Sequence, residues 1–397
     1  MQKSYLIIGV FAVALSCNQR DNVQQSVANY SPANTMVAAS QPKDTVSALL
    51  EKLDAKDKTH QIDSFFTKLS QKNHFNGDVL VAQEGQILYE NSFGVADRKT
   101  KDSLKIQSDF QLGSVSKQFT AVAIMMLKER GKLDYSDTIQ KFFPEFPYPG
   151  ITVQMLLTHR SGLPNYLYFC DQYCTSRTGA ISNMDVIHLM TQHKPEKYFK
   201  PNRRFQYSNT GYCVLAAIVE QVSGMPFADF MKKNVFDPLQ MRNTMVFNLP
   251  NDTLIPNPTT GYDKNGRKAG FDYLDGVVGD KGIYSNLGDL FKWDQALYTN
   301  KLIKQSTLQD AFQPYSKEFR GDKNYGFGWR ILKTDEGKVV FHSGWWHGYN
   351  CVFIRRLSDK STIIVLSNHI NWCINASRNL LNVLSETKDT TSLDLND

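Results

Sequence analysis

The sequence predicts an α+β fold, an antiparallel sheet flanked by helices together with a mainly helical second region, and three observations lead to this prediction. Residues 77–94 form two alternating apolar runs around Glu84-Gly85, which is the pattern of a β-hairpin. Residues 134–242 have a mostly helical pattern with long loops, and residues 328–368 return to four apolar strands. Strands near both ends of the chain, with helices between them, suggest that the two termini complete one sheet.

The length and composition of the chain favour a single large folding unit. Its 397 residues, of which 41% are hydrophobic, suffice for one large core or two subdomain cores. No internal repeat and no Pro- or Gly-rich linker divides it, so we treat residues 44–387 as one domain with a helical insertion. The net charge of +6 is spread along the chain, and its basic clusters are short, which argues against nucleic acid as a partner.

Residues 1–17 have the layout of a secretory signal peptide, with one lysine, an apolar run and small residues before Cys17. This run is too short to span a bilayer. The ending Ala14-Leu15-Ser16-Cys17 resembles a bacterial lipobox, so we expect a lipid-anchored protein of the bacterial cell envelope. The alternative is ordinary cleavage nearby, which would leave a periplasmic or secreted protein without a lipid anchor.

The segments that border the domain have simpler patterns. Residues 18–43 are polar with few large apolar side chains, which predicts a flexible tether. Apolar residues then recur with the helical period over residues 46–69, interrupted at Asp57-Lys58, and we expect one broken helix or two short ones. Residues 388–397 are expected to form a loose tail.

The cysteines suggest structural roles and no metal site. Cys170 and Cys174 could close a small surface loop by a disulfide, and Cys351 with Cys373 is a weaker candidate pair, although spacing alone fixes no connectivity. Neither the H-E-x-x-H motif nor paired C-x-x-C motifs occur. We therefore expect no bound metal.

The first candidate catalytic pair is Ser114 and Lys117, at the start of a nearly all-apolar helical stretch. Residues three apart share one face of a helix, so the two side chains could share a hydrogen bond. Burial and the helix dipole would lower the pKa of the lysine, and a neutral lysine could take the proton from the serine. The alternative is a serine that only caps the helix beside a solvated lysine. Ser116 is expected to be a bystander.

Two further polar clusters precede or follow apolar elements. Tyr207 and Asn209 lead into a second buried helix, where the tyrosine could act as a general acid and the asparagine could hold Lys117 or a substrate carbonyl. The alternative here is an ordinary turn and helix cap.

The third cluster, His342-Ser343-Gly344-Trp345, follows an apolar strand. The backbone N–H groups of Ser114 and Trp345 could form an oxyanion hole. The alternative is a strand that ends in an aromatic loop and only packs.

Taken together, the S-x-x-K, Y-x-N and H-x-G clusters resemble the active-site motifs of the class C β-lactamase and serine DD-peptidase family. The same family contains stretches similar to LLTHRSGL (156–163), GIYSNLGDLFKW (282–293), YGFGW (325–329) and HSGWWHGY (342–349). The resemblance covers about residues 60–385. It implies a sheet and a helical region with the active site between them, and no cofactor.

By this resemblance Ser114 is the nucleophile, Lys117 and Tyr207 manage its proton, and Asn209 contacts the substrate. His342, Ser343 and Gly344 occupy the third motif, where β-lactamases have Lys-Thr-Gly. A histidine with its ordinary pKa of about 6.5 would be mostly neutral at pH 7, so we rank β-lactam hydrolysis below peptidase or esterase action. A role in which protonated His342 binds a substrate carboxylate and a role in which it only orients its strand both remain open.

The sequence thus predicts a serine hydrolase that forms an acyl-enzyme on amide or ester bonds, with D-peptides as the leading substrates. Small peptides, esters and peptidoglycan fragments all fit the resemblance, and a carboxylesterase or β-lactamase of the same family is the first alternative. The second alternative is a non-hydrolytic module of the cell envelope that binds peptidoglycan or a partner protein.

Overall fold

The structure is a computed structural model that describes residues 45–175, 177–247, 255–270, 272–319, 321–370 and 372–385. The chain divides into two units, Met1–Leu49 and Leu50–Asp397, and the fold described here belongs to the second. The expected signal peptide, the lipidation site Cys17, the tether and the tail lie outside the described residues.

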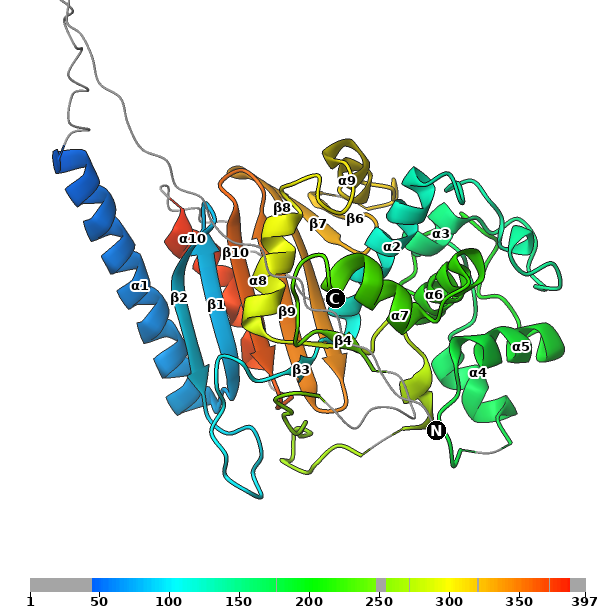
Figure 1. Cartoon of the computed structure of the whole chain (residues 1–397), viewed down its shortest axis with the longest axis horizontal. Coiled ribbons are helices and arrows are strands. Elements are labelled where there is room, and N and C mark those ends of the chain that lie inside the picture. Colours follow the sequence, from blue (N-terminus) through cyan, green and yellow to red (C-terminus); the bar gives the residue numbers. More distant parts are fainter. Residues whose placement is uncertain are drawn as a thin grey trace, which may run out of the picture. The chain divides into compact units, whose positions relative to one another are not determined.

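A seven-stranded antiparallel sheet with the order β2-β1-β10-β9-β8-β7-β6 dominates this unit (Figure 1). Strand β1 of the first hairpin pairs with β10, the last strand, which confirms that segments from both ends of the domain complete one sheet. The strands are β1 (Gly77–Gln83), β2 (Gln86–Phe93), β6 (Lys323–Tyr325), β7 (Arg330–Thr334), β8 (Gly337–Trp346), β9 (Tyr349–Arg356) and β10 (Ser361–Ser367).

A second, three-stranded sheet has the order β3-β5-β4, with β3 (Phe110–Gln111), β4 (Met245–Val246) and β5 (Ile283–Ser285).

Between the two hairpin strands and the last four strands the chain is mainly helical, as predicted. The helices are α1 (Thr45–Asn73), α2 (Lys117–Glu129), α3 (Val153–Leu157), α4 (Tyr166–Tyr173), α5 (Asn183–His193), α6 (Asn209–Ser223), α7 (Phe227–Met231), α8 (Leu287–Ala296), α9 (Gln305–Ala311) and α10 (Leu380–Leu384). Short 3₁₀ or π turns are η1 (Gly113–Ser116), η2 (Ile139–Lys141), η3 (Lys232–Phe236), η4 (Tyr273–Gly276) and η5 (Trp372–Asn379).

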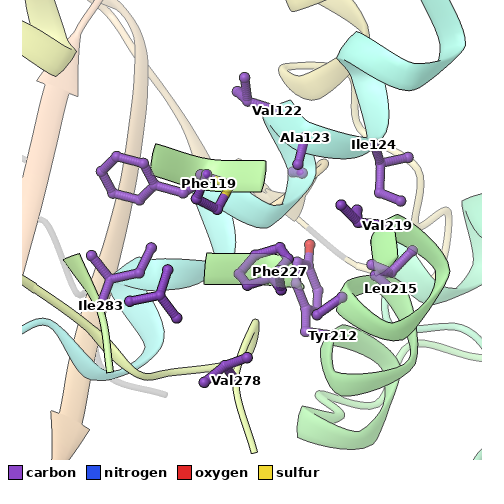
Figure 2. Close-up of a cluster of buried hydrophobic side chains, with 14 of the residues drawn as sticks. Phe119, Val122, Ala123, Ile124, Tyr212, Leu215, Val219, Phe227, Val278 and Ile283 are labelled. Carbon is purple, nitrogen blue, oxygen red and sulfur yellow. The ribbon is translucent and has the colours of Figure 1, made fainter. Parts of the chain in front are cut away.

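The alternation of side chains along β1 separates two hydrophobic cores. Val79 and Val81 pack with Ile62 and Phe66 of α1 on one face of the sheet. Leu80 and its neighbours on the other face join a larger core that includes α2, α6 and α8. Figure 2 shows part of this larger core, where side chains of α2, α6 and α7 meet the segment before β5. The helix α2, which carries a predicted catalytic lysine, is therefore fixed by buried packing along its length.

Two expectations about local structure are corrected. Residues 45–73 form one continuous helix, α1. Its apolar pattern is interrupted at Asp57-Lys58 because both residues belong to polar pairs that lie four residues apart along the helix. An ion pair joins Asp54 to Lys58 at 2.8 Å, and Gln61 donates a hydrogen bond to Asp57 at 2.8 Å. Such pairs stabilise a helix without contributing to its apolar face.

Cys170 and Cys174 are free thiols, so the predicted surface disulfide is wrong. Cys170 lies in α4 and Cys174 directly follows it. The two thiols lie within hydrogen-bonding reach of each other, but no S–S bond joins them. Cys351 is also a free thiol and donates a hydrogen bond to the Gln111 carbonyl at 3.4 Å, while the side chain of Cys373 lies outside the described part of the chain.

No single helix of the described residues combines the length and the apolar content needed to cross a membrane. Two consecutive helical segments, Asn209–Ser223 and Phe227–Phe236, have sufficient length and apolar content only when they are taken together, and the chain bends by 77° between them.

Candidate active site

The turn η1 carries Ser114 directly against strand β8. Gly113 has φ +52°, and a Cβ there would lie 2.6 Å from the backbone nitrogen of Trp345. A Cβ on Gly344 would lie 1.9 Å from the Leu112 carbonyl oxygen and 3.1 Å from the Ser114 nitrogen. Only glycine fits at both positions. The backbone amides of Ser114 and Trp345 therefore come from two segments in direct contact, which is the arrangement that an oxyanion hole needs.

Ser114 precedes the α-helix, because η1 is a 3₁₀ turn and α2 begins at Lys117. No side-chain hydrogen bond caps the start of α2, so the alternative in which Ser114 serves only as a helix cap has no support. Ser116 is fully buried and accepts a hydrogen bond from the Ile283 amide at 3.2 Å. Its hydroxyl therefore joins η1 to β5.

The Lys117 amine is fully buried and has three hydrogen-bond partners. Its Nζ lies 2.9 Å from Ser114 Oγ, 2.8 Å from Asn209 Oδ1 and 2.8 Å from the Asp280 carbonyl oxygen. The two carbonyl oxygens can only accept, whereas the serine hydroxyl can also donate. A neutral amine has two N–H groups and one lone pair. With both N–H groups used by Asn209 and Asp280, the lone pair points at the hydroxyl of Ser114.

The surroundings of Lys117 favour this neutral form. Burial lowers the pKa of Lys117 to about 7, with the Asp280 carboxylate acting in the opposite direction and the Arg330 guanidinium in the same direction. The amine can thus be unprotonated near neutral pH, which a lysine in water cannot. This geometry suits a general base for Ser114.

Tyr207 and Asn209 reach the site from the start of α6. Ser208 caps this helix through a hydrogen bond from the Gly211 amide at 3.3 Å, so Asn209 becomes the first helical residue with its side chain on Lys117. The Lys117 Nζ lies 4.9 Å from the centre of the Tyr207 ring. The structure therefore brings Ser114, Lys117, Tyr207 and Asn209 together.

The ring of His159 packs against the ring of Tyr207, a contact that was not predicted from the sequence. It is fully buried, its ring centre lies 4.3 Å from that of Tyr207, and its Nδ1 accepts a hydrogen bond from the Ser208 amide at 3.1 Å. Burial holds the pKa of His159 well below its ordinary value, so it is neutral. The motif LLTHRSGL was the available signal, but no spacing rule relates it to residue 207.

His342 is buried in β8 and faces the interior of the site. Its Nδ1 lies 2.7 Å from the Ser343 carbonyl oxygen and its Nε2 lies 3.0 Å from the Tyr325 hydroxyl. Since a carbonyl only accepts, Nδ1 carries the proton and Nε2 accepts from Tyr325. Burial, assisted by Arg330 and Lys117, holds the pKa of His342 well below its ordinary value. These contacts favour the orienting role over carboxylate binding by a protonated ring.

The rest of the third motif extends β8 farther than expected. The strand runs through Ser343, Gly344 and the exposed Trp345 to Trp346, and a tight turn at His347-Gly348 leads into β9. The expected aromatic loop is thus the end of a hairpin. This end is fixed to η4, because the side chains of Trp346 and His347 both bond Asp275 Oδ1, at 2.7 and 2.8 Å.

A permanent positive charge lies beside Tyr207. The guanidinium carbon of Arg330, the first residue of β7, is 5.5 Å from the centre of the Tyr207 ring. Next to the same tyrosine a pocket of about 200 Å³ opens between the segments that precede α4 and α6. Its walls include the exposed aromatic side chains Tyr168 and Tyr198.

Within the residues that the structure describes, no group of three or more His, Cys, Asp or Glu side chains is arranged to hold a metal ion.

Comparisons with known proteins agree with this geometry. The beta-lactamase family profile matches residues 62–372. Penicillin-binding protein 4* of Bacillus subtilis is 39% identical over 326 residues, which are 79% of this chain and 72% of the relative. The D-aminopeptidase of Brucella canis is 24% identical over 309 residues, 77% of this chain and 58% of that protein.

Among solved structures, a penicillin-binding protein from Bacillus halodurans superposes with a TM-score of 0.71 at 26% identity, over 79% of this chain and 98% of that one. This likeness confirms the predicted fold. Because the family profile spans most of the chain, the protein belongs to the beta-lactamase family and is a serine hydrolase of that family.

Proposed function

We propose that this protein is a D-peptidase of the DD-carboxypeptidase type, which forms an acyl-enzyme on Ser114 and releases the product to water. The observation that carries the proposal is the position of the Lys117 amine between two carbonyl oxygens and the Ser114 hydroxyl. In its neutral form the amine gives its two N–H groups to the carbonyls, which leaves its lone pair for the hydroxyl. A base held in this way activates a serine nucleophile.

The reaction follows from these contacts. Lys117 takes the proton of Ser114 as Oγ attacks the scissile carbonyl carbon, and the resulting oxyanion accepts hydrogen bonds from the amides of Ser114 and Trp345. The C–N bond then breaks, and the proton passes from Lys117 by way of the Tyr207 hydroxyl to the leaving amine. Water then attacks the acyl carbon and gives its proton to Lys117, which passes it to Ser114 Oγ as the acyl C–O bond breaks, so that the acid is released and both residues return to their starting states.

Peptides with a free carboxylate beside the scissile bond are supported as substrates by Arg330. Its guanidinium is permanently charged and lies beside Tyr207. His342, at the position of the β-lactamase lysine, is buried and neutral. The carboxylate would therefore bind to Arg330. The relative named D-aminopeptidase supports the choice of D-residues.

Hydrolysis of an acylated peptide ending in D-Ala-D-Ala tests this function, beside the L-Ala-L-Ala peptide, a nitrophenyl ester and a chromogenic cephalosporin. We expect the D-peptide to be cleaved fastest among the peptides and Ser114→Ala to lose about 10⁴-fold in kcat. Cleavage of the ester alone would contradict the proposal in favour of an esterase, and fastest turnover of the cephalosporin in favour of a β-lactamase. Silence on all four would favour a binding module.

We further propose that the protein is exported and anchored to the cell envelope through a lipid on Cys17. The support is the lipobox-like ending at residues 14–17. A Cys17→Ser variant should then pass from the membrane fraction to the soluble fraction and lose incorporation of a labelled fatty acid. Membrane retention of that variant would contradict the anchor.

A further inference from the structure

We propose that Asp280, Tyr166 and Lys281 form a buried positioning network that aims the Lys117 lone pair at Ser114 and holds a negative charge beside it. The inference rests on the proposed role of Lys117 as base. None of the three residues would touch the substrate, so they are positioning residues.

Asp280 connects the network to the base through two different groups. Its backbone carbonyl accepts one of the Lys117 N–H groups at 2.8 Å, and its carboxylate Oδ2 accepts the Tyr166 hydroxyl proton at 2.8 Å. Tyr166 and Asp280 are both almost completely buried. The side-chain bond fixes the peptide group whose carbonyl sets the orientation of the amine.

Lys281 holds the other end of the network as an ammonium ion. Its Nζ donates to the Tyr166 hydroxyl at 2.9 Å, to the Leu274 carbonyl at 2.9 Å and to the Val277 carbonyl at 2.6 Å. Because the Tyr166 proton is already given to Asp280, its oxygen can only accept from Lys281. Three acceptors thus surround Lys281, which requires three N–H groups, and the Asp280 carboxylate lies 3.9 Å away.

The loop that carries Asp280 has little freedom to relax. Gly279 has φ +98°, and a Cβ there would lie 2.6 Å from Cβ of Ala216 and 2.7 Å from the Tyr212 carbonyl oxygen. The Gly279 carbonyl accepts a hydrogen bond from Thr120 in α2 at 2.7 Å. The loop is therefore clamped between the two helices that carry Lys117 and Asn209, and a change at the Asp280 carboxylate is transmitted to the site.

The charge of Asp280 also acts on Lys117 directly. It stabilises the protonated amine and so raises the pKa of Lys117, against the effect of burial. Removing this charge should lower that pKa, so that the neutral base is present at lower pH. The charged or titratable groups around the Lys117 amine are Asp280, Lys281, Arg330, Tyr207, Tyr212, His159 and His342.

The test is the rate at which a fluorophosphonate labels Ser114, measured from pH 5 to 10. In Asp280→Asn we expect the midpoint of the acid limb to fall by about 1 pH unit, because one nearby opposite charge is lost. Asp294→Asn is the matched control, since Asp294 is equally buried and paired with Arg355 at 2.6 Å in another part of the fold. Its midpoint should not move. A lower plateau with an unmoved midpoint in Asp280→Asn would overturn the proposal.

Tyr166→Phe tests the anchoring separately, because it removes one hydroxyl and no charge at neutral pH. We expect a labelling plateau about 10-fold lower with unchanged probe affinity, since the weakened carbonyl position misaligns the amine. If Tyr166→Phe were labelled with the same plateau rate as the wild type, the anchoring role would be overturned. This test does not depend on whether Asp280→Asn folds. Labelling needs no peptide turnover, so intact labelling without D-peptide cleavage would reject only the substrate class, and an unlabelled wild type would reject Ser114 and Lys117 as the reacting pair.

Discussion

Lys117 and Lys281 are both buried in the described part of the chain, yet their surroundings favour different protonation states. Around Lys281 two partners are carbonyl oxygens and the third, the Tyr166 hydroxyl, already donates its proton to Asp280, so these contacts favour an amine with three protons. Around Lys117 two partners only accept and the third, Ser114, can donate. Burial lowers the pKa of both lysines. Burial therefore makes a neutral lysine accessible, and the hydrogen-bond capacity of its partners decides which lysine becomes the base.

The largest expected effect separates the two lysines by activity. Lys117→Met removes the base and should lower kcat for the D-peptide by about 10²- to 10⁴-fold, the contribution typical of a general base. KM should change little, because the amine faces Ser114 rather than the open pocket. Steady-state kinetics measure this, and a loss below 10-fold would show that another group takes the serine proton.

Lys281→Met should act first on stability. It leaves the Asp280 carboxylate without its buried cation, which typically costs about 3–5 kcal/mol. Chemical denaturation measures the loss, and the double variant Asp280→Asn with Lys281→Met should recover part of it because no lone buried charge remains. If Lys281→Met were as stable as the wild type, Lys281 could not be a buried ammonium ion that compensates the charge of Asp280.

The approach of β8 to η1 gives a third prediction, about the oxyanion hole rather than the base. Gly344→Ala would place a Cβ 1.9 Å from the Leu112 carbonyl oxygen, so the strand must move away from Ser114. We expect kcat to fall about 10²- to 10³-fold, the effect of losing one oxyanion donor. The acid limb of the pH profile should stay in place because Lys117 is untouched. If Gly344→Ala kept the wild-type kcat, β8 could not supply an oxyanion-hole donor.

The smallest effect is expected at Ser116, the second serine of the S-x-x-K stretch. Ser116→Ala leaves the buried Ile283 amide without its acceptor, which should cost about 1–3 kcal/mol of stability. The kcat of the folded variant should remain within a few-fold of wild type, since Ser116 does not contact the Lys117 amine. A loss comparable with that of Ser114→Ala would mean that the nucleophile has been misassigned.

Much of the fold could be predicted because its signals are local. Short apolar runs mark β1 and β2, and the last two strands, β9 and β10, are buried along their whole length. The continuity of α1 was missed because its Asp54–Lys58 and Asp57–Gln61 pairs are polar, which an apolar period does not register. The Cys170–Cys174 disulfide was predicted from spacing, and spacing does not distinguish a disulfide from two thiols that share a hydrogen bond.

The candidate site was predictable as far as side chains within short motifs determine it. Ser114 and Lys117 are one helical turn apart, and Asn209 begins a capped helix. The third partner of Lys117 is a backbone carbonyl 163 residues away, and no residue type encodes that contact. Arg330 and His159 were missed for a related reason, since their positions depend on how β7 and the loop after α3 pack around Tyr207.

The protonation states of Lys117 and Lys281 in the free enzyme decide whether Lys117 can be the base of Ser114. We would record heteronuclear NMR of the lysine side chains with ¹³C and ¹⁵N labels from pH 5 to 10, and assign the buried signals with Lys117→Met and Lys281→Met. We expect the Lys117 amine to lose its proton near pH 7 and Lys281 to stay an ammonium ion at that pH. A Lys117 amine that remains protonated up to pH 9 would contradict its assignment as the base of Ser114.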